Sequence, residues 1–196
     1  MCIRDSVYVT HSQSEAFAMA DRVVIMNEGR IAQTGTTRGV YRNPANRFVA
    51  EFVGTNNILT GRVSGLSADR IGIETDLGQF QATRPDHMRL EDDQPATFVV
   101  SADLVQLSGV EAALENRIAC SLISEEFVGS MVTLFLETAG GVEFKVQTSQ
   151  RILERLDLSG STTLFASWSP EHVHILPNDE SAWPDRAATV REHERT

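Results

Sequence analysis

The residue best placed to do chemistry is a histidine near the start of the chain, at the end of a run with β-strand composition. Residues 7–10 are mostly β-branched or aromatic, and His11 follows them. Ser12 and Glu15 have the spacing of a capping box, so a helix should begin at once. Ligands of α/β sheets bind at the carboxyl ends of strands, and free N–H groups at a helix start favour anions such as phosphate. His11 is therefore a candidate phosphate-facing residue; the alternative is a histidine that only caps a turn.

The elements that must position His11 are predicted from the pattern that follows it. Residues 12–20 should form a helix, and residues 23–26 are a four-residue apolar run typical of a buried strand. A turn at Gly29 should lead into a returning strand over residues 30–34. A short helix over residues 35–41 and a second one over residues 46–53, ended by Gly54, complete this part. We expect an α/β arrangement up to residue 56.

After Gly54 the composition changes to short alternating runs separated by Gly, Asp and Asn. Such short, evenly spaced strands favour small barrels over a parallel sheet, and the pattern restarts after Glu115. Asp76-Leu77-Gly78 and Ala139-Gly140-Gly141 should be hairpin turns, and residues 150–156 one or two helical turns. The predicted strands are residues 58–63, 70–75, 79–83, 96–100, 105–107, 117–123, 131–136, 142–148, 163–167 and 173–176.

Composition and charge exclude several classes of protein. The net charge of −10 is uneven: residues 1–56 carry 6 basic and 5 acidic side chains (+1), and residues 57–178 carry 8 and 17 (−9). An acidic β-rich region is a poor match for nucleic acid, so no nucleic-acid partner is expected. No apolar run approaches the roughly 20 residues of a membrane span, and no export leader is seen. Cys2 and Cys120 are too few for a disulfide framework.

The string around His11 resembles a known family. Residues 9–16, Val-Thr-His-Ser-Gln-Ser-Glu-Ala, followed by Ala-Asp-Arg-Val-Val-Ile-Met at residues 20–26 and Gly29-Arg30-Ile31, are similar to the switch-histidine region of ABC transporter ATP-binding subunits. The resemblance implies an α/β remnant of a P-loop NTPase domain over residues 7–56. It also implies that His11 contacts the γ-phosphate of ATP, with Mg²⁺ as the second cofactor.

Two later strings resemble the TOBE module that follows the ATPase domain in such importers. These are residues 127–132, Phe-Val-Gly-Ser-Met-Val, and residues 167–177, Ser-Trp-Ser-Pro-Glu-His-Val-His-Ile-Leu-Pro. The resemblance implies a mainly β region of OB-like small barrels over residues 57–178, with roles in dimerisation and regulation. Ser101-Ala102-Asp103-Leu104 departs from the Arg-Pro-Glu usual in the family.

The resemblance also implies partners and a location. They are a second ATP-binding subunit in a homodimer, transmembrane permease subunits and, indirectly, a solute-binding protein, on the cytoplasmic face of the inner membrane. Residues 48–59 look most like polyamine-type importer subunits. No G-x-x-x-x-G-K-[ST] string occurs, so the chain should not hydrolyse ATP alone, and the Mg²⁺ ligands are expected elsewhere.

Other expectations concern the termini and the remaining histidines. Residues 1–6 do not fit the pattern that follows and are interpreted as a non-native or truncated start, and residues 179–196 as a mobile tail. His172 and His174 should share one strand face, but no third ligand is spaced to form a metal site, so none is predicted. Two alternative functions stay open: a stand-alone module for a small anion, and an oligonucleotide-binding barrel, which the charge disfavours.

Overall fold

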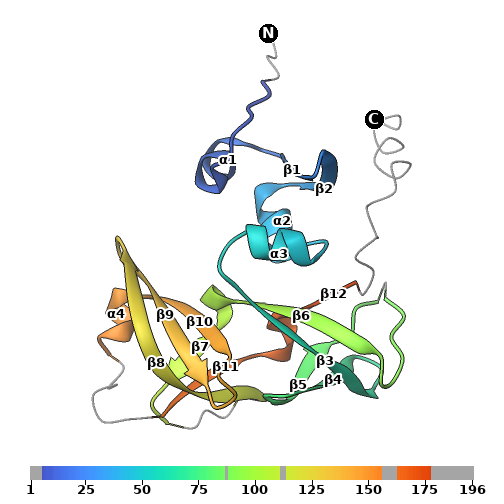
Figure 1. The fold of residues 1–196 in the computed structure, drawn as a ribbon, viewed down its shortest axis with the longest axis vertical. Helices are drawn as coiled ribbons and strands as arrows, with labels where there is room; N and C mark the ends of the chain where they lie inside the picture. The colour runs from blue at the N-terminus through green and yellow to red at the C-terminus, as the bar shows by residue number, and fades with distance from the viewer. Residues whose placement is uncertain (1–5, 87, 111–113, 156–162, 178–196) are drawn as a thin grey trace.

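A computed structural model describes residues 6–86, 88–110, 114–155 and 163–177. Figure 1 shows a small α/β region at the N-terminal end, lying over a larger β-rich domain. The chain passes from one to the other at Gly54, which has a φ of +71° that glycine tolerates best. A Cβ there would lie 2.5 Å from the Tyr41 ring, so a side chain is excluded by space as well as by backbone conformation.

The first elements of the α/β region are a short helix and a two-stranded antiparallel sheet. Helix α1 (Gln13–Met19) begins after Ser12, whose hydroxyl accepts a hydrogen bond from the Glu15 N–H, as the capping box predicts. Strands β1 (Val23–Asn27) and β2 (Arg30–Gly35) follow. Their turn places Glu28 and Gly29 at positive φ. The predicted order of helix, strand, turn and strand is confirmed.

Two further helices cover one face of this small sheet. Helix α2 (Thr37–Arg42) is capped by the Thr36 hydroxyl, and α3 (Arg47–Phe52) by the Asn46 side chain, which accepts from the Val49 N–H. The apolar residues between them form the core of the α/β region. Its buried members are Val23, Ile25, Ala32, Val40, Val49 and Val53.

One expectation for this region is wrong. Residues 7–10 are extended but form no strand, and Val7 and Val9 are 94% and 90% exposed. A strand needs a neighbour to satisfy its N–H and C=O groups, and no described residue pairs with this run. The run 23–26 is also only half buried, because Val24 and Met26 point away from α2 and α3 and remain exposed.

The β-rich domain consists of two five-stranded antiparallel sheets. The first has the order β12-β6-β3-β4-β5 and the second the order β10-β9-β8-β11-β7. Their curled shape is visible in Figure 1, and the predicted OB-like barrel architecture is confirmed. The elements in chain order are β3 (Asn56–Leu66), β4 (Arg70–Thr75), β5 (Gly78–Thr83), β6 (Pro95–Ser101), η1 (Ala102–Leu104), β7 (Gln106–Ser108), β8 (Asn116–Val128), β9 (Met131–Thr138), β10 (Glu143–Ser149), α4 (Gln150–Leu153), β11 (Leu164–Trp168), η2 (Pro170–His172) and β12 (Val173–Leu176).

The two sheets are built from two repeats of the same topology. The first repeat is β3 to β7 with η1, and the second repeat is β8 to β12 with α4 and η2. Each repeat gives its last strand to the other sheet, since β7 pairs with β11 and β12 pairs with β6. The register shifts match as well: one lies between Val63 and Gly65 of β3, the other between Leu122 and Ser124 of β8. The predicted restart of the strand pattern after Glu115 is thus confirmed.

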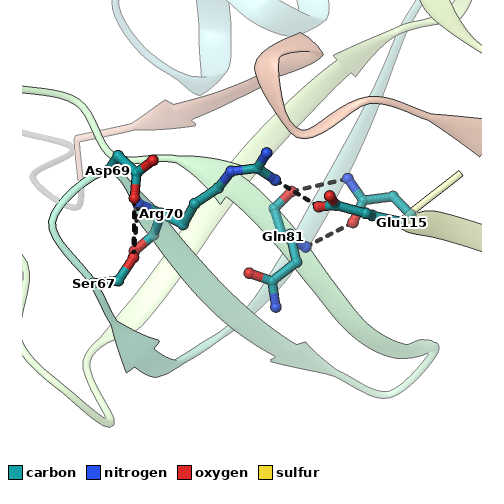
Figure 2. Close-up of polar contacts among 6 residues, drawn as sticks. Ser67, Asp69, Arg70, Gln81 and Glu115 are labelled. Atoms are coloured by element: carbon teal, nitrogen blue, oxygen red, sulfur yellow. Dashed lines mark hydrogen bonds and ion pairs between the residues drawn. The ribbon is translucent and has the colours of Figure 1, made fainter.

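A matched pair of asparagines ties the repeats together. Asn57 of β3 donates to the Lys145 carbonyl and accepts from the Lys145 N–H on β10. Asn116 of β8 does the same with the backbone of Gln81 on β5. Figure 2 shows the contacts to Gln81 beside an ion pair between Arg70 and Glu115. Each repeat therefore satisfies backbone groups of the other through a buried amide.

The core of the β-rich domain runs between the two sheets. Trp168 is fully buried, with its ring centroid 5.2 Å from that of Phe80 and 5.3 Å from that of Phe144. These phenylalanines occupy equivalent positions in β5 and β10, each directly before the backbone that an asparagine binds. The aromatic stack at the centre thus draws on both repeats.

Candidate functional site

His11 lies in the link between the exposed run 7–10 and α1. Its side chain is exposed and makes no hydrogen bond or ion pair with any residue that the structure describes. The turn around it is well ordered by its neighbours: the Thr10 hydroxyl accepts from the Ser12 N–H at 3.0 Å and donates to the Glu15 carboxylate at 2.8 Å. The Tyr8 hydroxyl also donates to Glu15, at 3.2 Å. The backbone at His11 is thereby fixed while its imidazole is presented to solvent.

The outer face of the β1–β2 hairpin is apolar and uncovered. Val24, Met26 and Ile31 are each at least half exposed, whereas Val23 and Ile25 on the other face are buried. Strands with apolar residues on both faces are typical of sheets that are covered on both sides. This face and the unpaired run 7–10 both lie in the segment that carries His11.

The α/β region meets the β-rich domain at a polar junction that the sequence did not reveal. Arg42 at the end of α2 forms two hydrogen bonds to the carboxylate of Asp103 in η1, at 3.2 and 2.8 Å. Partial burial alone would raise the pKa of the Asp103 carboxyl, but the hydrogen bonds and positive charge of Arg42 outweigh it and lower that pKa below its ordinary value.

Three further contacts complete the junction. Asn56 donates to the carbonyls of Ala50 and Val53 at the end of α3, and His174 of β12 lies 2.9 Å from the Pro44 carbonyl between the two helices. A small apolar cluster lies beside them. It consists of Ala50, Val99 and Leu176, with Ile58 packed against it.

The prediction that His172 and His174 share a strand face is wrong. His172 ends the 3-10 turn η2, and only His174 belongs to β12, where its ring faces Pro44. Pro170 starts η2, which ends at His172, so His172 lies just before the strand of residues 173–176. Among the described residues no three His, Cys, Asp or Glu side chains are grouped as metal ligands.

Two other features bear on binding. Cys120 is buried in the core, and burial raises the pKa of its thiol to about 11, which makes it a poor nucleophile. A surface pocket between β3, β4 and the turn before β6 is lined by four carboxylates and one guanidinium. These groups are Glu74, Asp76, Asp92, Asp93 and Arg62.

Comparison with known families identifies the β-rich domain. The model of the TOBE domain matches residues 82–176. This part of the chain is a TOBE domain. The match begins in β5 of the first repeat and ends in β12, so it includes both partners of the β6–β12 pairing.

Relatives extend the likeness into the α/β region. The spermidine/putrescine import ATP-binding protein PotA of Thermobifida fusca is 34% identical over 187 residues, covering 87% of this chain and 44% of the relative. The Fe(3+) ions import ATP-binding protein FbpC of Streptomyces coelicolor is 35% identical over 144 residues, covering 73% and 37%. These matches confirm the resemblance to the C-terminal part of an ABC transporter ATP-binding subunit. The chain spans less than half the length of these relatives.

Among solved structures, the cytoplasmic molybdate-binding protein ModG shares the fold. The TM-score is 0.56 at 19% identity, and the likeness covers 64% of this chain and 99% of that one. At this identity the likeness concerns the fold of the TOBE domain alone. In the part of the chain that the structure describes, no helix is long and apolar enough to cross a membrane.

One local sequence pattern bears on the junction. Residues 101–107, Ser-Ala-Asp-Leu-Val-Gln-Leu, align with residues 169–175, Ser-Pro-Glu-His-Val-His-Ile. This alignment places Asp103 opposite Glu171 as the acidic residue of each 3-10 turn. Whether Asp103 or Glu171 pairs with an arginine depends on where α2 packs, and a local sequence pattern does not determine that.

Proposed function

We propose that this chain is the C-terminal part of the ATP-hydrolysing subunit of an ABC importer that energises solute uptake. The observation that carries the proposal is the alignment with import ATP-binding proteins, which covers 87% of the chain. A stand-alone TOBE module would match only over the β-rich domain. The α/β region of 7–56 is then the end of the nucleotide-binding domain, and the region of 57–178 its TOBE domain.

In this proposal His11 is the residue that faces the nucleotide. With ATP and Mg²⁺ held by the P-loop portion, a histidine at this place donates a hydrogen bond to the γ-phosphate and helps to orient the attacking water. The chain supplies the means to position it: Thr10, Ser12 and Glu15 fix the backbone on either side and leave the imidazole exposed. The Mg²⁺ ligands are outside this chain, which is inactive alone.

The uncovered face of the α/β region supports the same proposal. Val24, Met26 and Ile31 are exposed on one face of the β1–β2 hairpin, and the unpaired run 7–10 exposes Val7 and Val9. A P-loop portion that adds strands beside residues 7–10 and packs on this face would remove both from water. The exposed apolar side chains are then the contact surface of a larger domain.

The proposed partners follow from the same family. Two complete subunits close on ATP as a homodimer and drive transmembrane permease subunits on the cytoplasmic face of the plasma membrane, with a solute-binding protein acting through the permease. The PotA-type relatives favour a polyamine such as spermidine or putrescine as the solute. The FbpC-type relative carries a different solute in its name, so the solute is the least constrained part of this proposal.

A module for small anions is less well supported. The pocket of the TOBE domain is lined by Glu74, Asp76, Asp92 and Asp93, and Arg62 is the single cation among its lining residues. Four carboxylates repel an oxyanion. No described feature of the domain favours that alternative.

The proposal is tested in a complete subunit, made by placing the P-loop portion of the Thermobifida fusca relative before residue 7. His11→Ala should reduce ATP turnover at least a hundredfold, because a transition-state contact is lost, while ATP binding stays within threefold. Met19→Ala, at the other end of α1 and exposed in this chain, is the control and should keep near-normal turnover. Normal hydrolysis by the His11→Ala protein would contradict the role given to His11.

A further inference from the structure

We propose that the Arg42–Asp103 pair is a latch that makes the α2–α3 helices and the TOBE domain move as one body. The pair joins residues 61 positions apart, from the last turn of α2 to the 3-10 turn between β6 and β7. It is bidentate, and about a third of each side chain is exposed. Paired N–H···O bonds in a fixed fork geometry define an orientation as well as a distance.

The other junction contacts act on α3 and on the connection between the helices. Asn56 binds the carbonyls that end α3, and His174 lies against the Pro44 carbonyl. Among the side-chain hydrogen bonds and ion pairs of the described residues, the pair with Asp103 joins α2 itself to the β-rich domain. Arg42 thus adds a direct polar contact between the β-rich domain and α2, which also packs near α3 and Gly54 through Val40 and Tyr41.

The second repeat shows that this pairing is selective. Glu171 occupies in η2 the position that Asp103 occupies in η1, and 74% of its side chain is exposed. Its carboxylate lies 3.9 Å from Nε2 of the neighbouring His172, which pairs with it as an ion only when protonated, and no described arginine reaches it. An acidic residue in this 3-10 turn is therefore compatible with the TOBE fold without an arginine, so the fold alone does not require the Arg42–Asp103 pair.

The latch defines a route by which motion of the α/β region reaches the β-rich domain. Helix α2 follows β2 directly and shares one apolar cluster with both strands of the small sheet and with α1. A displacement of that sheet reaches α2 through Val40 and is passed to η1, and so to the β6–β12 pair, through the latch. Use of this coupling during ATP turnover rests on the proposed function, whereas the latch itself does not.

The test measures amide hydrogen exchange by mass spectrometry on this chain as it is. Asp103→Asn keeps the shape of the side chain but removes its charge. Exchange of the α2 amides, such as those of Val40 and Asn43, should become at least tenfold faster, while amides of β8 to β10 stay within twofold. Glu171→Gln is the matched control and should leave both regions within twofold of the original chain.

A charge exchange keeps the test decisive if the single variant is poorly folded. Arg42→Asp combined with Asp103→Arg should restore at least half of the lost protection in α2. Unchanged exchange in α2 for Asp103→Asn, or equal acceleration in α2 and in β8 to β10, would overturn the latch. Because no nucleotide is present, this result is independent of ATP hydrolysis and of the role proposed for His11.

Discussion

The two repeats of the β-rich domain share one topology but bind different neighbours. At the residue before each asparagine clamp, Asn56 of the first repeat holds the end of α3, whereas Glu115 of the second repeat pairs with Arg70 of the first (Figure 2). In the 3-10 turns, Asp103 binds Arg42 and Glu171 remains exposed. Asp103 and Asn56 of the first repeat bind the α/β region directly, and β12 of the second repeat adds His174 and Leu176 to this junction.

Surface exposure follows the same division. The β8–β9 hairpin of the second repeat extends past its register shift, where Ile123, Phe127 and Val128 are at least half exposed. Figure 1 shows this hairpin projecting from the body of the domain. The matching part of β3 ends at Leu66 and packs against the core. Equivalent positions in the repeats therefore have different roles. Those in β3 pack against the core, whereas those in β8 are exposed.

The largest expected effect is loss of an asparagine clamp. Asn116→Ala should destabilise the fold by about 2–4 kcal/mol, because two hydrogen bonds are lost and the N–H and C=O of Gln81 lose their partner. Asn57→Ala should cost nearly the same, since its contacts with Lys145 have the same geometry. Urea unfolding followed by circular dichroism measures both. A difference of more than about 2 kcal/mol between the losses of unfolding free energy in the two variants would show that the clamps are not equivalent.

A smaller difference should separate two equivalent positions at the register shifts. Val63 of β3 is 2% exposed and Leu122 of β8 is 43% exposed. Val63→Ala should cost about 2 kcal/mol through lost burial, and Leu122→Ala less than about 1 kcal/mol despite the larger side chain removed. Denaturant midpoints at equal m-values give the comparison. Equal costs would mean that the β8–β9 hairpin is covered in solution.

The smallest effect concerns pH. Because the pKa of Asp103 is lowered in the folded chain, its ionised form adds stability above the unfolded pKa of about 4, and this is lost as pH falls through the lower folded pKa. Asp103→Asn should therefore lower the thermal midpoint slightly at pH 7, because the pair is partly exposed to solvent, and the gap should narrow as pH falls through the lowered folded pKa. Thermal unfolding across pH 2.5–7 measures it, with Glu171→Gln as control. A gap that widens in acid would contradict the assignment.

Local patterns predicted much of the fold. β4 (Arg70–Thr75) and β12 (Val173–Leu176) have the expected bounds, and the caps Ser12 and Asn46 start helices as their residue types indicate. The prediction for β8 was too short, because its outer half alternates poorly and is stabilised by pairing with β9. His172 was expected on the same strand face as His174, but it ends the 3-10 turn that Pro170 initiates, just before β12.

Local sequence patterns predicted only part of the candidate site. His11 was found from its string and its place before a helix start, and its role stays a prediction. Residues 23–26 were taken for a buried strand, although Val24 and Met26 are exposed, because an apolar run reports the character of residues and not whether anything covers them. The Arg42–Asp103 pair could be found only from the tertiary structure, since no local rule connects residues 61 positions apart.

The order of helices, strands and turns could be predicted from the sequence, because helix caps, glycines at turns and the alternation of apolar and polar residues act over a few residues. The exchange of β7 and β12 between the sheets, the crossed asparagine clamps and the choice of Asp103 over Glu171 were decided by the tertiary structure. Each depends on contacts between segments far apart in the chain. Two repeats with similar strings can therefore take one fold and still present different surfaces to their surroundings.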